Sequence, residues 1–569
     1  MIWNIQKSDI DEYGALEVSE LFKHILKNRE ITPESARKLM EMPVSLLDTP
    51  TGIPGAMEAA TRIFELAHDK KKPFVVFADY DVDGMTAGYI MTDFLLSIGC
   101  PAMVKYPERS EGYGLSVEFA NELIKSGVPL TVITVDNGVT ANKAIKKLRE
   151  HGIETIVTDH HERGYELPDC IICDPWLTNE PANGDGKGLC GAAVAWKVCM
   201  IVEEMVERES GVQTNICEKY LPYVGIGTVA DVMPMTDENR ALVKMALSEI
   251  NKRNPIPFIK SLKDIFDLNT VNAKDIGWSI APKLNSSSRM GDTQLAAMSL
   301  FETEEAVLNE RLTKVVKMDK KRKEYTDKAI EEALEYNEPT NAICLFDASS
   351  YPQGICGIIA GKLAETYQKP AIVYFGNAGN ELQCSCRSTP WLDIKSIINI
   401  EAQKGNAKGA MGHAQACGAV LYKDKIEDFI RGTNETISTI LAELNIEEVG
   451  EEEIFIDSEI SLKDINKNIQ QEINSIPYWK NIPLLSVMDI KVKKINPFKT
   501  DKGHLILEMT DGQNKAYALG WYMGKDYEDL GSPKKISIAG ELEPAKFIGK
   551  FLGLDYNDPV LMIKYLKTA

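Results

Sequence analysis

The stretch that decides the fold of this chain is residues 73–84, PFVVFADYDVDG. It begins with an apolar run, 73–77, that has the length and the β-branched and aromatic content of a buried strand. It ends in three aspartates at alternate positions, Asp79, Asp81 and Asp83, followed by a glycine. A strand that ends in clustered carboxylates predicts a binding site at the edge of a sheet.

Similar runs follow at residues 130–135 (LTVITV) and 154–158 (ETIVT), and amphipathic helical patterns separate them. Short apolar strands that alternate with helices are typical of a parallel sheet covered by helices on both faces. We therefore expect an α/β domain with a parallel sheet over residues 49–245. Ligands of such sheets bind beyond the carboxyl ends of the strands, which is where the aspartates stand.

Three carboxylates within five residues would repel one another strongly unless cations lay between them. Hard divalent cations with oxygen ligands relieve that repulsion. The alternative is a calcium loop of the EF-hand type, which shares the pattern D-x-D-x-D-G. That loop closes with a glutamate at position 12, whereas position 12 counted from Asp79 is Ile90. The closing residue therefore counts against a calcium loop.

Further acidic and imidazole groups follow the later strands. The second run ends at Asp136, and the third ends in Asp159-His160-His161. Only seven histidines occur in 569 residues, so two adjacent ones directly after a strand favour ligands over isolated surface histidines. Neutral imidazole suits Mn²⁺ or Zn²⁺ better than Ca²⁺. A fourth apolar run delivers Asp231, which taken alone could equally cap a helix or a turn.

Composition narrows the class of protein. The net charge of −20 argues against a protein that coats nucleic acid non-specifically, although it allows a local basic groove. Eleven cysteines, an odd number, fit a reducing compartment better than a disulfide framework, and the pair Cys170 and Cys173 fits either part of a zinc site or two buried thiols. We find neither a membrane-spanning run nor a signal peptide, so the cytoplasm is the expected location.

The rest of the chain divides into four further parts. The first 48 residues have the pattern of a helical lead-in, and residues 246–336 are rich in connecting helices. Residues 337–440 repeat the alternation of strands and helices and are expected to form a second α/β domain. The part 441–569 starts with an acidic linker, IEEVGEEE at 446–453, and continues with short strands that predict an OB-like β-barrel.

Taken in order, four segments resemble the DHH phosphoesterase superfamily: DYDVDG at 79–84, VDNG at 135–138, TDHH at 158–161 and ADVMP at 230–234. Six others resemble its RecJ branch: YPERSEGYGL at 106–115, GLCGA at 188–192, APKLNSSSRMG at 281–291, QGICGI at 353–358, CRS at 386–388 and GHA at 412–414. The resemblance covers residues 45–420 and continues more loosely through the barrel. It implies that residues 337–440 are the DHH-associated domain of that family.

The resemblance implies a centre of two divalent cations, Mn²⁺ or Mg²⁺. Two ions about 3.5–4 Å apart can activate water, neutralise a phosphate and stabilise the leaving oxygen together. Asp136 is then the expected bridging ligand, while His161 and Asp159 would orient His160 or touch the scissile phosphate. The implied metal ligands are Asp79, Asp81, Asp83, Asp136, His160 and Asp231, and the implied catalytic residues are Asp136, His160, His161 and Asp159.

The family also implies a wall that holds the 5′-phosphate of a DNA strand. Guanidinium groups bind phosphate in a bidentate manner that lysine does not reproduce, and a glycine allows close approach of the nucleic-acid backbone. On the residues alone, each arginine could equally form an ordinary surface ion pair. The implied substrate-binding residues are Arg109, Asn285, Arg289, Ser385, Arg387, Ser388, Gly412 and His413.

Three positions depart from the family's pattern. Ser288 replaces a glycine, Met411 replaces the first glycine of a Gly-Gly-His element, and Tyr351-Pro352 replaces Trp-His. None of these is an implied metal ligand. The departures leave open how many nucleotides the groove grips and how tightly.

The activity implied is that of a single-stranded-DNA-specific exonuclease, which degrades from the 5′ end, releases 5′-mononucleotides and serves recombination and repair. Alternatives are a nanoRNase or small-nucleotide phosphatase, and a catalytically inactive replication scaffold. The barrel and the lead-in count against the first, and the retained acidic ligands count against the second. The expected partners of a monomeric enzyme are single-stranded DNA, a helicase and a single-strand-binding protein. In the barrel, Tyr517, Trp521 and Tyr522 either stack bases or belong to the core.

Overall fold

The computed structural model describes residues 2–5, 8–68, 72–164, 166–178, 188–253, 255–336, 342–376, 379–443, 453–477, 482–495, 503–546 and 548–568. Contacts divide the chain into two compact units. The large unit contains residues 49–233 and 246–448, and the small unit contains residues 1–48, 234–245 and 449–569.

The first sheet of the large unit is parallel throughout, which confirms the expected α/β fold. Its strand order is β3-β2-β4-β5-β6, and β2 and β4 are buried along their whole length. The strands are β2 (Phe74–Ala78), β3 (Ala102–Lys105), β4 (Thr131–Val135), β5 (Glu154–Thr158) and β6 (Ile171–Cys173). The β-branched and aromatic side chains of the predicted runs therefore point into two apolar layers, one on each face.

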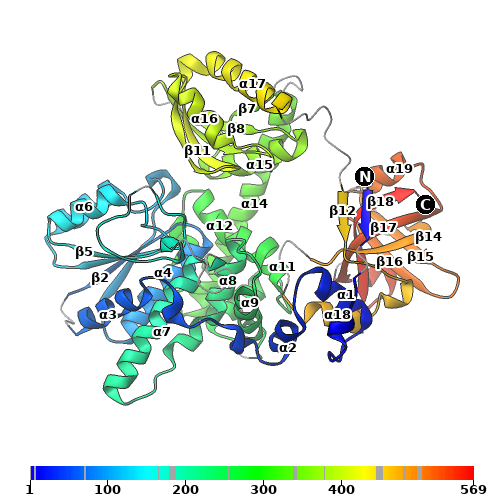
Figure 1. The fold of residues 1–569 in the computed structure, drawn as a ribbon, viewed down its shortest axis with the longest axis horizontal. Helices are drawn as coiled ribbons and strands as arrows, with labels where there is room; N and C mark the ends of the chain where they lie inside the picture. The colour runs from blue at the N-terminus through cyan, green and yellow to red at the C-terminus, as the bar shows by residue number, and fades with distance from the viewer. Residues whose placement is uncertain are drawn as a thin grey trace. The chain divides into compact units, whose positions relative to one another are not determined.

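Helices cover both faces of this sheet (Figure 1). One face carries Val75, Phe77 and Val132, which pack under α5 (Val117–Ser126) and α6 (Asn142–Glu150). The other face contacts α3 (Ala56–Ala67), α4 (Val82–Ser97) and α7 (Gly191–Ser210). The carboxyl ends of β2, β4 and β5 therefore open at one edge, between the helices that follow them.

The expected connecting helices are present in the described residues. The longest is α14, Glu305–Tyr336, which has 32 residues and contacts both α10 and α12. The others are α8 (Leu221–Ala230), α9 (Asp237–Ile250), α10 (Pro257–Ile265), α12 (Ala281–Arg289) and α13 (Thr293–Ala297). Helix α9 begins in the small unit and ends in the large one.

The second sheet of the large unit is mixed, and its order is β10-β11-β9-β8-β7. Only β7 and β8 run parallel, because β9, β10 and β11 form an antiparallel meander. The strands are β7 (Cys344–Asp347), β8 (Ala371–Phe375), β9 (Glu381–Arg387), β10 (Ala407–His413) and β11 (Ala416–Tyr422). Helix α15 (Cys356–Tyr367) covers one face, and α16 (Ile394–Gln403) and α17 (Ile426–Glu443) cover the other.

The small unit contains a closed five-stranded barrel, which confirms the expected OB-like domain. Its order is β14-β15-β16-β18-β17, and β14 pairs with β17 to close it. The strands are β14 (Leu485–Ile495), β15 (Leu505–Thr510), β16 (Lys515–Gly520), β17 (Lys535–Pro544) and β18 (Pro559–Thr568). Most of the acidic linker at 446–453 lies outside the described residues.

The N-terminal residues pack on this barrel rather than forming a separate lead-in. Helices α1 (Glu20–Asn28) and α2 (Pro33–Glu41) contribute Phe22, Leu26 and Leu39 to the core that contains the barrel strands. Thr32 is the N-cap of α2, and its side chain accepts a hydrogen bond from the Ser35 amide. Residues Ile2–Ile5, expected to be helical, instead form β1, which pairs in parallel with β12 (Glu453–Ile456). None of the described helices is both long enough and apolar enough to span a membrane.

Candidate active site

The first acidic motif wraps the end of β2 around the start of α4. Asp79 follows the strand directly and is buried. Asp81 is the N-cap of α4, and its side chain accepts a hydrogen bond from the Gly84 amide at 3.1 Å. Asp83 lies in the first turn of α4 and is buried. The alternation of aspartates in the sequence therefore places three carboxylates at one strand end.

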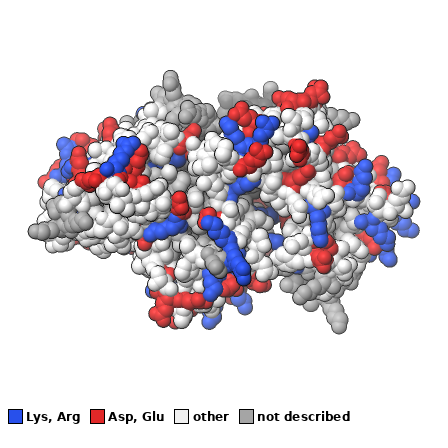
Figure 2. Space-filling model, turned by 90° about the horizontal axis from the view of Figure 1, so that it is seen from below, with Lys and Arg blue, Asp and Glu red and all other residues white. Residues whose placement is uncertain are grey.

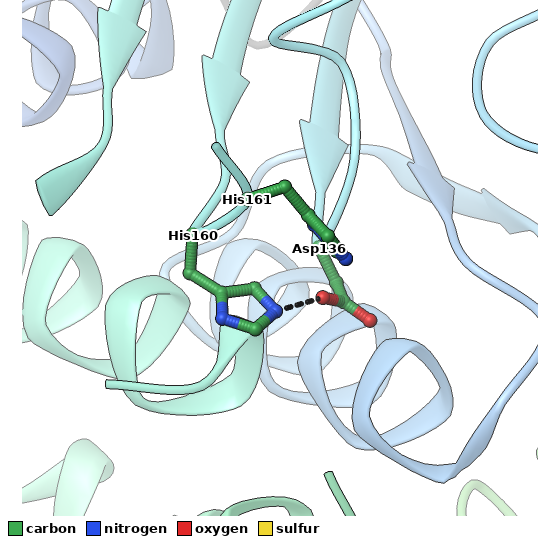
Figure 3. A group of neighbouring side chains, drawn as sticks. All are labelled: Asp136, His160 and His161. Carbon is green, nitrogen blue, oxygen red and sulfur yellow. Dashed lines mark ion pairs between the residues drawn. The ribbon is translucent and has the colours of Figure 1, made fainter. Parts of the chain in front are cut away.

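The second and third motifs follow the neighbouring strands β4 and β5. Asp136 has a left-handed backbone (φ 60°), which aspartate tolerates better than most residues. His160 Nε2 lies 2.9 Å from Asp136 Oδ1, and the ring is directed at that carboxylate (Figure 3). The same nitrogen is 3.7 Å from Oδ2 of Asp83 and 3.7 Å from Oδ2 of Asp231. All four motifs thus meet around one imidazole.

This cluster contains three sets of three residues, and within each set the ligand atoms lie within 4.8 Å of one another. They are Asp79-Asp81-Asp136, Asp136-His160-His161 and Asp83-His160-Asp231. Three buried atoms in the cluster, Asp79 Oδ1, Asp136 Oδ1 and His160 Nε2, make no hydrogen bond with any described residue. Buried polar atoms of this kind cost free energy unless a partner satisfies them. Carboxylate oxygens and imidazole nitrogen are the donors of Mn²⁺ and Mg²⁺ sites, so the residues fit divalent metal ions.

The pKa shifts in the cluster also favour a bound cation. Burial and neighbouring carboxylates raise the pKa of Asp79, Asp136 and Asp231 well above the ordinary range. Burial, followed by repulsion from Asp81, raises the pKa of Asp83 to about 6, and burial lowers the pKa of His160 to about 3. A cation in the cluster would restore the ionised carboxylates and keep the imidazole neutral.

Asp159 fixes the two histidines rather than joining the cluster. Its Oδ1 accepts hydrogen bonds from the amides of His160 (2.7 Å) and His161 (3.2 Å) and from His161 Nδ1 (2.8 Å). Its Oδ2 accepts a hydrogen bond from the Val139 amide at 2.9 Å. Burial opposes ionisation of Asp159, but these hydrogen bonds and the histidines lower its pKa overall. The geometry is that of a carboxylate that orients its neighbours.

The N-terminus of α7 also borders the cluster of carboxylates and histidines. The amides of Gly191 and Ala192 donate to Asp83 Oδ2 (2.6 Å) and Oδ1 (2.9 Å), an arrangement that helix N-termini favour for anions. A Cβ atom at Gly191 would lie 2.6 Å from Asp136 Oδ1, and one at Gly227 would lie 2.6 Å from Asp83 Oδ1. Both positions therefore require glycine. Sequence reasoning did not single out this role, although the motif containing Gly191 stood out.

Asp231 reaches the cluster from the C-cap of α8. The next residue, Val232, has a left-handed backbone (φ 59°), which is unfavourable for a β-branched side chain. The amides of Val232 and Met233 donate to the carbonyls of Val229 and Thr228, which is the hydrogen-bond pattern of a Schellman cap. Glycine usually takes this position, so a strained valine next to a candidate ligand is typical of a functional site.

The three arginines expected to bind phosphate lie near one another, and Arg109 and Arg289 lie near the carboxylates of the first acidic motif. Arg109 Nε donates to Ser288 Oγ at 3.2 Å, and Arg289 Nη1 donates to the Gly354 carbonyl at 2.7 Å. None of the three forms an ion pair with a carboxylate within the described ranges. Burial, then the charge of Arg109, lowers the pKa of Arg289 to about 9, with a smaller contribution from Arg387. Grouped guanidinium charges without carboxylate partners favour an anion as their ligand.

Arg387 lies at the end of β9, on a face that also carries Ser385 on the same strand. A Cβ atom at Gly357 would lie 3.1 Å from both Arg387 Nη2 and Ser385 Oγ, so α15 begins directly against them. His413 stands across the sheet from this pair, because β11 joins β9 to β10. Ser388 is turned differently: its amide donates to the Gln415 carbonyl, and its buried hydroxyl has no hydrogen-bond partner among the described residues.

Of the remaining expected substrate-binding residues, Asn285 lies on α12 and Gly412 lies on β10. Asn285 Oδ1 accepts a hydrogen bond from the Val82 amide at 3.1 Å and so braces the first acidic motif. Gly412 has φ 125°, and its carbonyl accepts a hydrogen bond from Lys395 at 2.9 Å. Met411 beside it is 83% exposed, the largest exposure among the large apolar residues described. Tyr351 instead packs with Tyr325 and Phe346 in the core under α15.

The barrel aromatics divide between core and surface. Tyr517 packs against Ile506 and Leu519 in a small apolar cluster that is separate from the main core of the barrel. Trp521 and Tyr522 are exposed, and the ring of His504 lies 4.8 Å and 4.6 Å from theirs. The charged side chains do not gather into a basic patch on the face drawn in Figure 2. On the face drawn in Figure 2, acidic and basic side chains are interspersed, in keeping with the net charge of −20.

Comparisons with known proteins match each of these parts. Residues 73–228 match the DHH family N-terminal domain, residues 341–439 match the DHHA1 domain, and residues 456–551 match the RecJ OB domain. The single-stranded-DNA-specific exonuclease RecJ of Bacillus subtilis is 26% identical, over 99% of this chain and 70% of the relative. The protein of the same name from Haemophilus influenzae is 28% identical, over 89% of this chain and 91% of the relative.

A solved structure has the same fold. The crystal structure of RecJ in complex with Mn²⁺ from Thermus thermophilus superposes with a TM-score of 0.81 at 20% identity, covering 100% of this chain and 80% of that one. The three matched domains follow one another in this chain, and the two relatives align with 99% and 89% of it. The chain therefore belongs to the RecJ family of the DHH superfamily.

Proposed function

We propose that this chain is a 5′→3′ exonuclease that degrades single-stranded DNA to 5′-mononucleotides and acts in recombination and repair. The observation that carries the proposal is the meeting of Asp79, Asp136, Asp231 and His160 around unsatisfied ligand atoms. Close to them lies a group of arginines that form no ion pair among the described residues. Like-named relatives are single-stranded-DNA-specific exonucleases, which supports the choice of substrate.

Two divalent cations, Mn²⁺ or Mg²⁺, would supply Lewis-acid stabilisation of the phosphate and activation of water when bound. Asp136 is the candidate bridge, because it belongs to two of the three sets of neighbouring ligand atoms. His160 would bind through Nε2, and Asp159 would keep both histidines in place. The proposed ligands are Asp79, Asp81, Asp83, Asp136, His160 and Asp231.

Recognition of the strand end is assigned to the arginines. Arg387 and Arg289 would hold a terminal 5′-phosphate, with Ser385 as hydroxyl donor. Arg109 stacks on the Tyr80 ring at 4.1 Å and is held by Ser288, one of the departures from the family's pattern. A group of arginines that binds a phosphorylated end beside the metal ligands would let an enzyme release one nucleotide at a time.

Parts of the proposal rest on the sequence alone. We assign catalysis to residues 49–245, connection to residues 246–336, the DHH-associated domain to 337–440 and strand binding to 441–569, where Trp521 and Tyr522 are exposed. We expect a cytoplasmic monomer that works with a helicase and a single-strand-binding protein.

The test is digestion of one oligonucleotide labelled at its 5′ end and one labelled at its 3′ end, each single-stranded or annealed, with Mn²⁺. We expect the 5′ label to appear at once as a mononucleotide, while the 3′ label shortens gradually and the duplex resists. Rapid hydrolysis of a dinucleotide with little action on long strands would instead identify a nanoRNase. No cleavage of either substrate at any metal concentration would favour the inactive scaffold.

A further inference from the structure

The loop over residues 106–115 is tied to the large unit at its start. The Tyr106 hydroxyl donates to the Met85 carbonyl at 3.0 Å. The Glu108 carboxylate accepts hydrogen bonds from the Thr293 amide (2.9 Å) and hydroxyl (2.8 Å). Arg109 then binds Ser288, as described above. These contacts fix where the loop leaves the sheet and direct its far end toward the metal ligands.

Tyr113 stands at that far end, between two glycines with positive φ. Gly112 has φ 96° and Gly114 has φ 72°, a backbone that other residues rarely adopt. The Tyr113 hydroxyl lies 3.1 Å from both ring nitrogens of His161, and the two rings meet edge to face with centroids 5.6 Å apart. His161 is itself held by Asp159 and lies next to His160. The position of Tyr113 relative to the metal ligands is therefore defined through a chain of contacts.

The hydroxyl and the ring of Tyr113 both contact His161, yet about half of the residue remains exposed. Tyr113 is 51% exposed, although Tyr106, Glu108 and Arg109 earlier in the loop are anchored. Tyr80, the other tyrosine beside the acidic motif, differs because the Arg109 guanidinium already covers its ring. Among these two tyrosines, only Tyr113 presents a broad aromatic surface to solvent next to the histidines. An aromatic surface fixed in place by its polar end is suited to stack on a base.

We infer that the exposed ring of Tyr113 stacks on a base that flanks the scissile phosphodiester, and so positions that bond over the metal ligands. The inference rests on the proposed function. Tyr113 is thus a substrate-contacting residue, and the hydroxyl contact with His161 sets the orientation of its ring. The interaction does not read sequence, since every base has a π face.

The test combines variants of Tyr113 with substrates that lack one base. Tyr113→Ala removes the ring, Tyr113→Phe keeps the ring but removes the contact with His161, and Met103→Ala is the control. Met103 is 59% exposed on β3 and lies outside the proposed site. The substrates are 5′-phosphorylated single strands that are intact, or abasic at the first or at the second nucleotide.

On the intact strand, we expect Tyr113→Ala to lower kcat/KM about 10- to 100-fold, as the loss of one stacked base predicts. Tyr113→Phe should lose only about threefold, and Met103→Ala should match the wild type. On the strand abasic at the stacked position, wild type and Tyr113→Ala should become equal within about twofold. The affinity for Mn²⁺ and the melting temperature should stay unchanged in both variants, which excludes a collapsed site.

Two results would overturn the inference. One is a Tyr113→Ala defect that persists undiminished on both abasic strands, because the ring would then act on something other than a base. The other is the absence of any defect on the intact strand. In both cases the wild type would still digest single-stranded DNA, whereas failure of the wild type to digest it would reject the proposed function and this inference together.

Discussion

Asp136→Asn is expected to abolish cleavage, lowering the rate at least about a thousandfold while single-stranded DNA still binds. Asp136 belongs to two of the three ligand sets and contacts His160, so its loss would remove a ligand from both of the proposed cations. Losing several kcal/mol of transition-state stabilisation corresponds to a rate change of this size. Asparagine has the same shape and also tolerates a φ of 60°, so the fold should persist.

The same substitution should make the metal-free protein more stable. The pKa of the Asp136 carboxyl is raised in the folded state by burial and by neighbouring aspartates. A group of this kind binds more protons when folded than when unfolded, so its ionisation at neutral pH opposes folding. Asparagine removes that charge. We expect a higher melting temperature without metal, by about 2–4 °C for each kcal/mol gained, and a smaller increase on adding Mn²⁺.

The measurements are single-turnover digestion with Mn²⁺, DNA binding by fluorescence anisotropy, and thermal unfolding with and without metal. Asp267→Asn is the matched control, because Asp267 has the same left-handed backbone (φ 57°) but is exposed and distant in sequence from every motif. It should change neither cleavage nor stabilisation by metal. Cleavage by Asp136→Asn at near the wild-type rate would show that Asp136 is not the bridging ligand.

Arg387→Ala is expected to reduce the preference for 5′-phosphorylated over 5′-hydroxyl strands about 100-fold. The side chain is partly buried, and its Nη1 donates only to the Cys386 carbonyl among the contacts described. Burial lowers its pKa, yet the group stays cationic, so a bound phosphate would gain a charge-assisted and bidentate partner. Arg387→Lys should restore little, because an ammonium group cannot bind two phosphate oxygens in that geometry.

The readout for Arg387→Ala is the ratio of kcat/KM values for the phosphorylated and unphosphorylated forms of one strand. Arg431→Ala is the control, since Arg431 on α17 is exposed and pairs with Asp428. The affinity for Mn²⁺ should not change in either variant. A ratio equal to that of the wild type would remove Arg387 from recognition of the strand end.

The part of the site that lies at the ends of the β-strands was predictable from sequence for a simple reason. Strands of a parallel sheet share one carboxyl edge, so Asp79, Asp136 and His160 had to lie close together once the apolar runs were read as parallel strands. Asp231 was less certain because it follows a helix, and only the resemblance placed it in the same cluster.

Contacts between distant segments were not predictable in this way. The amides of α7 that hold Asp83 come 108 and 109 residues later in the chain. Neither periodicity nor spacing reports which helix start meets which carboxylate. The contact between Tyr113 and His161 is of the same kind, and a lone tyrosine in a glycine-rich loop gives no signal by itself. Phe22 and Leu26 near the N-terminus pack in one core with the barrel strands near the C-terminus, which is another contact between distant segments.

Ser288 illustrates how a departure from a family pattern gains a meaning only in three dimensions. The hydroxyl that replaces a glycine donates to the Asn285 carbonyl and accepts the Arg109 Nε–H. It therefore helps to hold one of the arginines assigned to the strand, a role that glycine lacks a side chain to perform. The sequence alone left the consequence of this residue open.

The proposed chemistry requires that this cluster of carboxylates and imidazole holds two cations. Anomalous diffraction from crystals grown with Mn²⁺, collected near the manganese absorption edge, measures this claim without reference to activity. We predict two peaks about 3.5–4 Å apart, with the Asp136 carboxylate between them and His160 Nε2 on one. No peak among these residues, or a single ion bound only at the protein surface, would contradict a two-metal site.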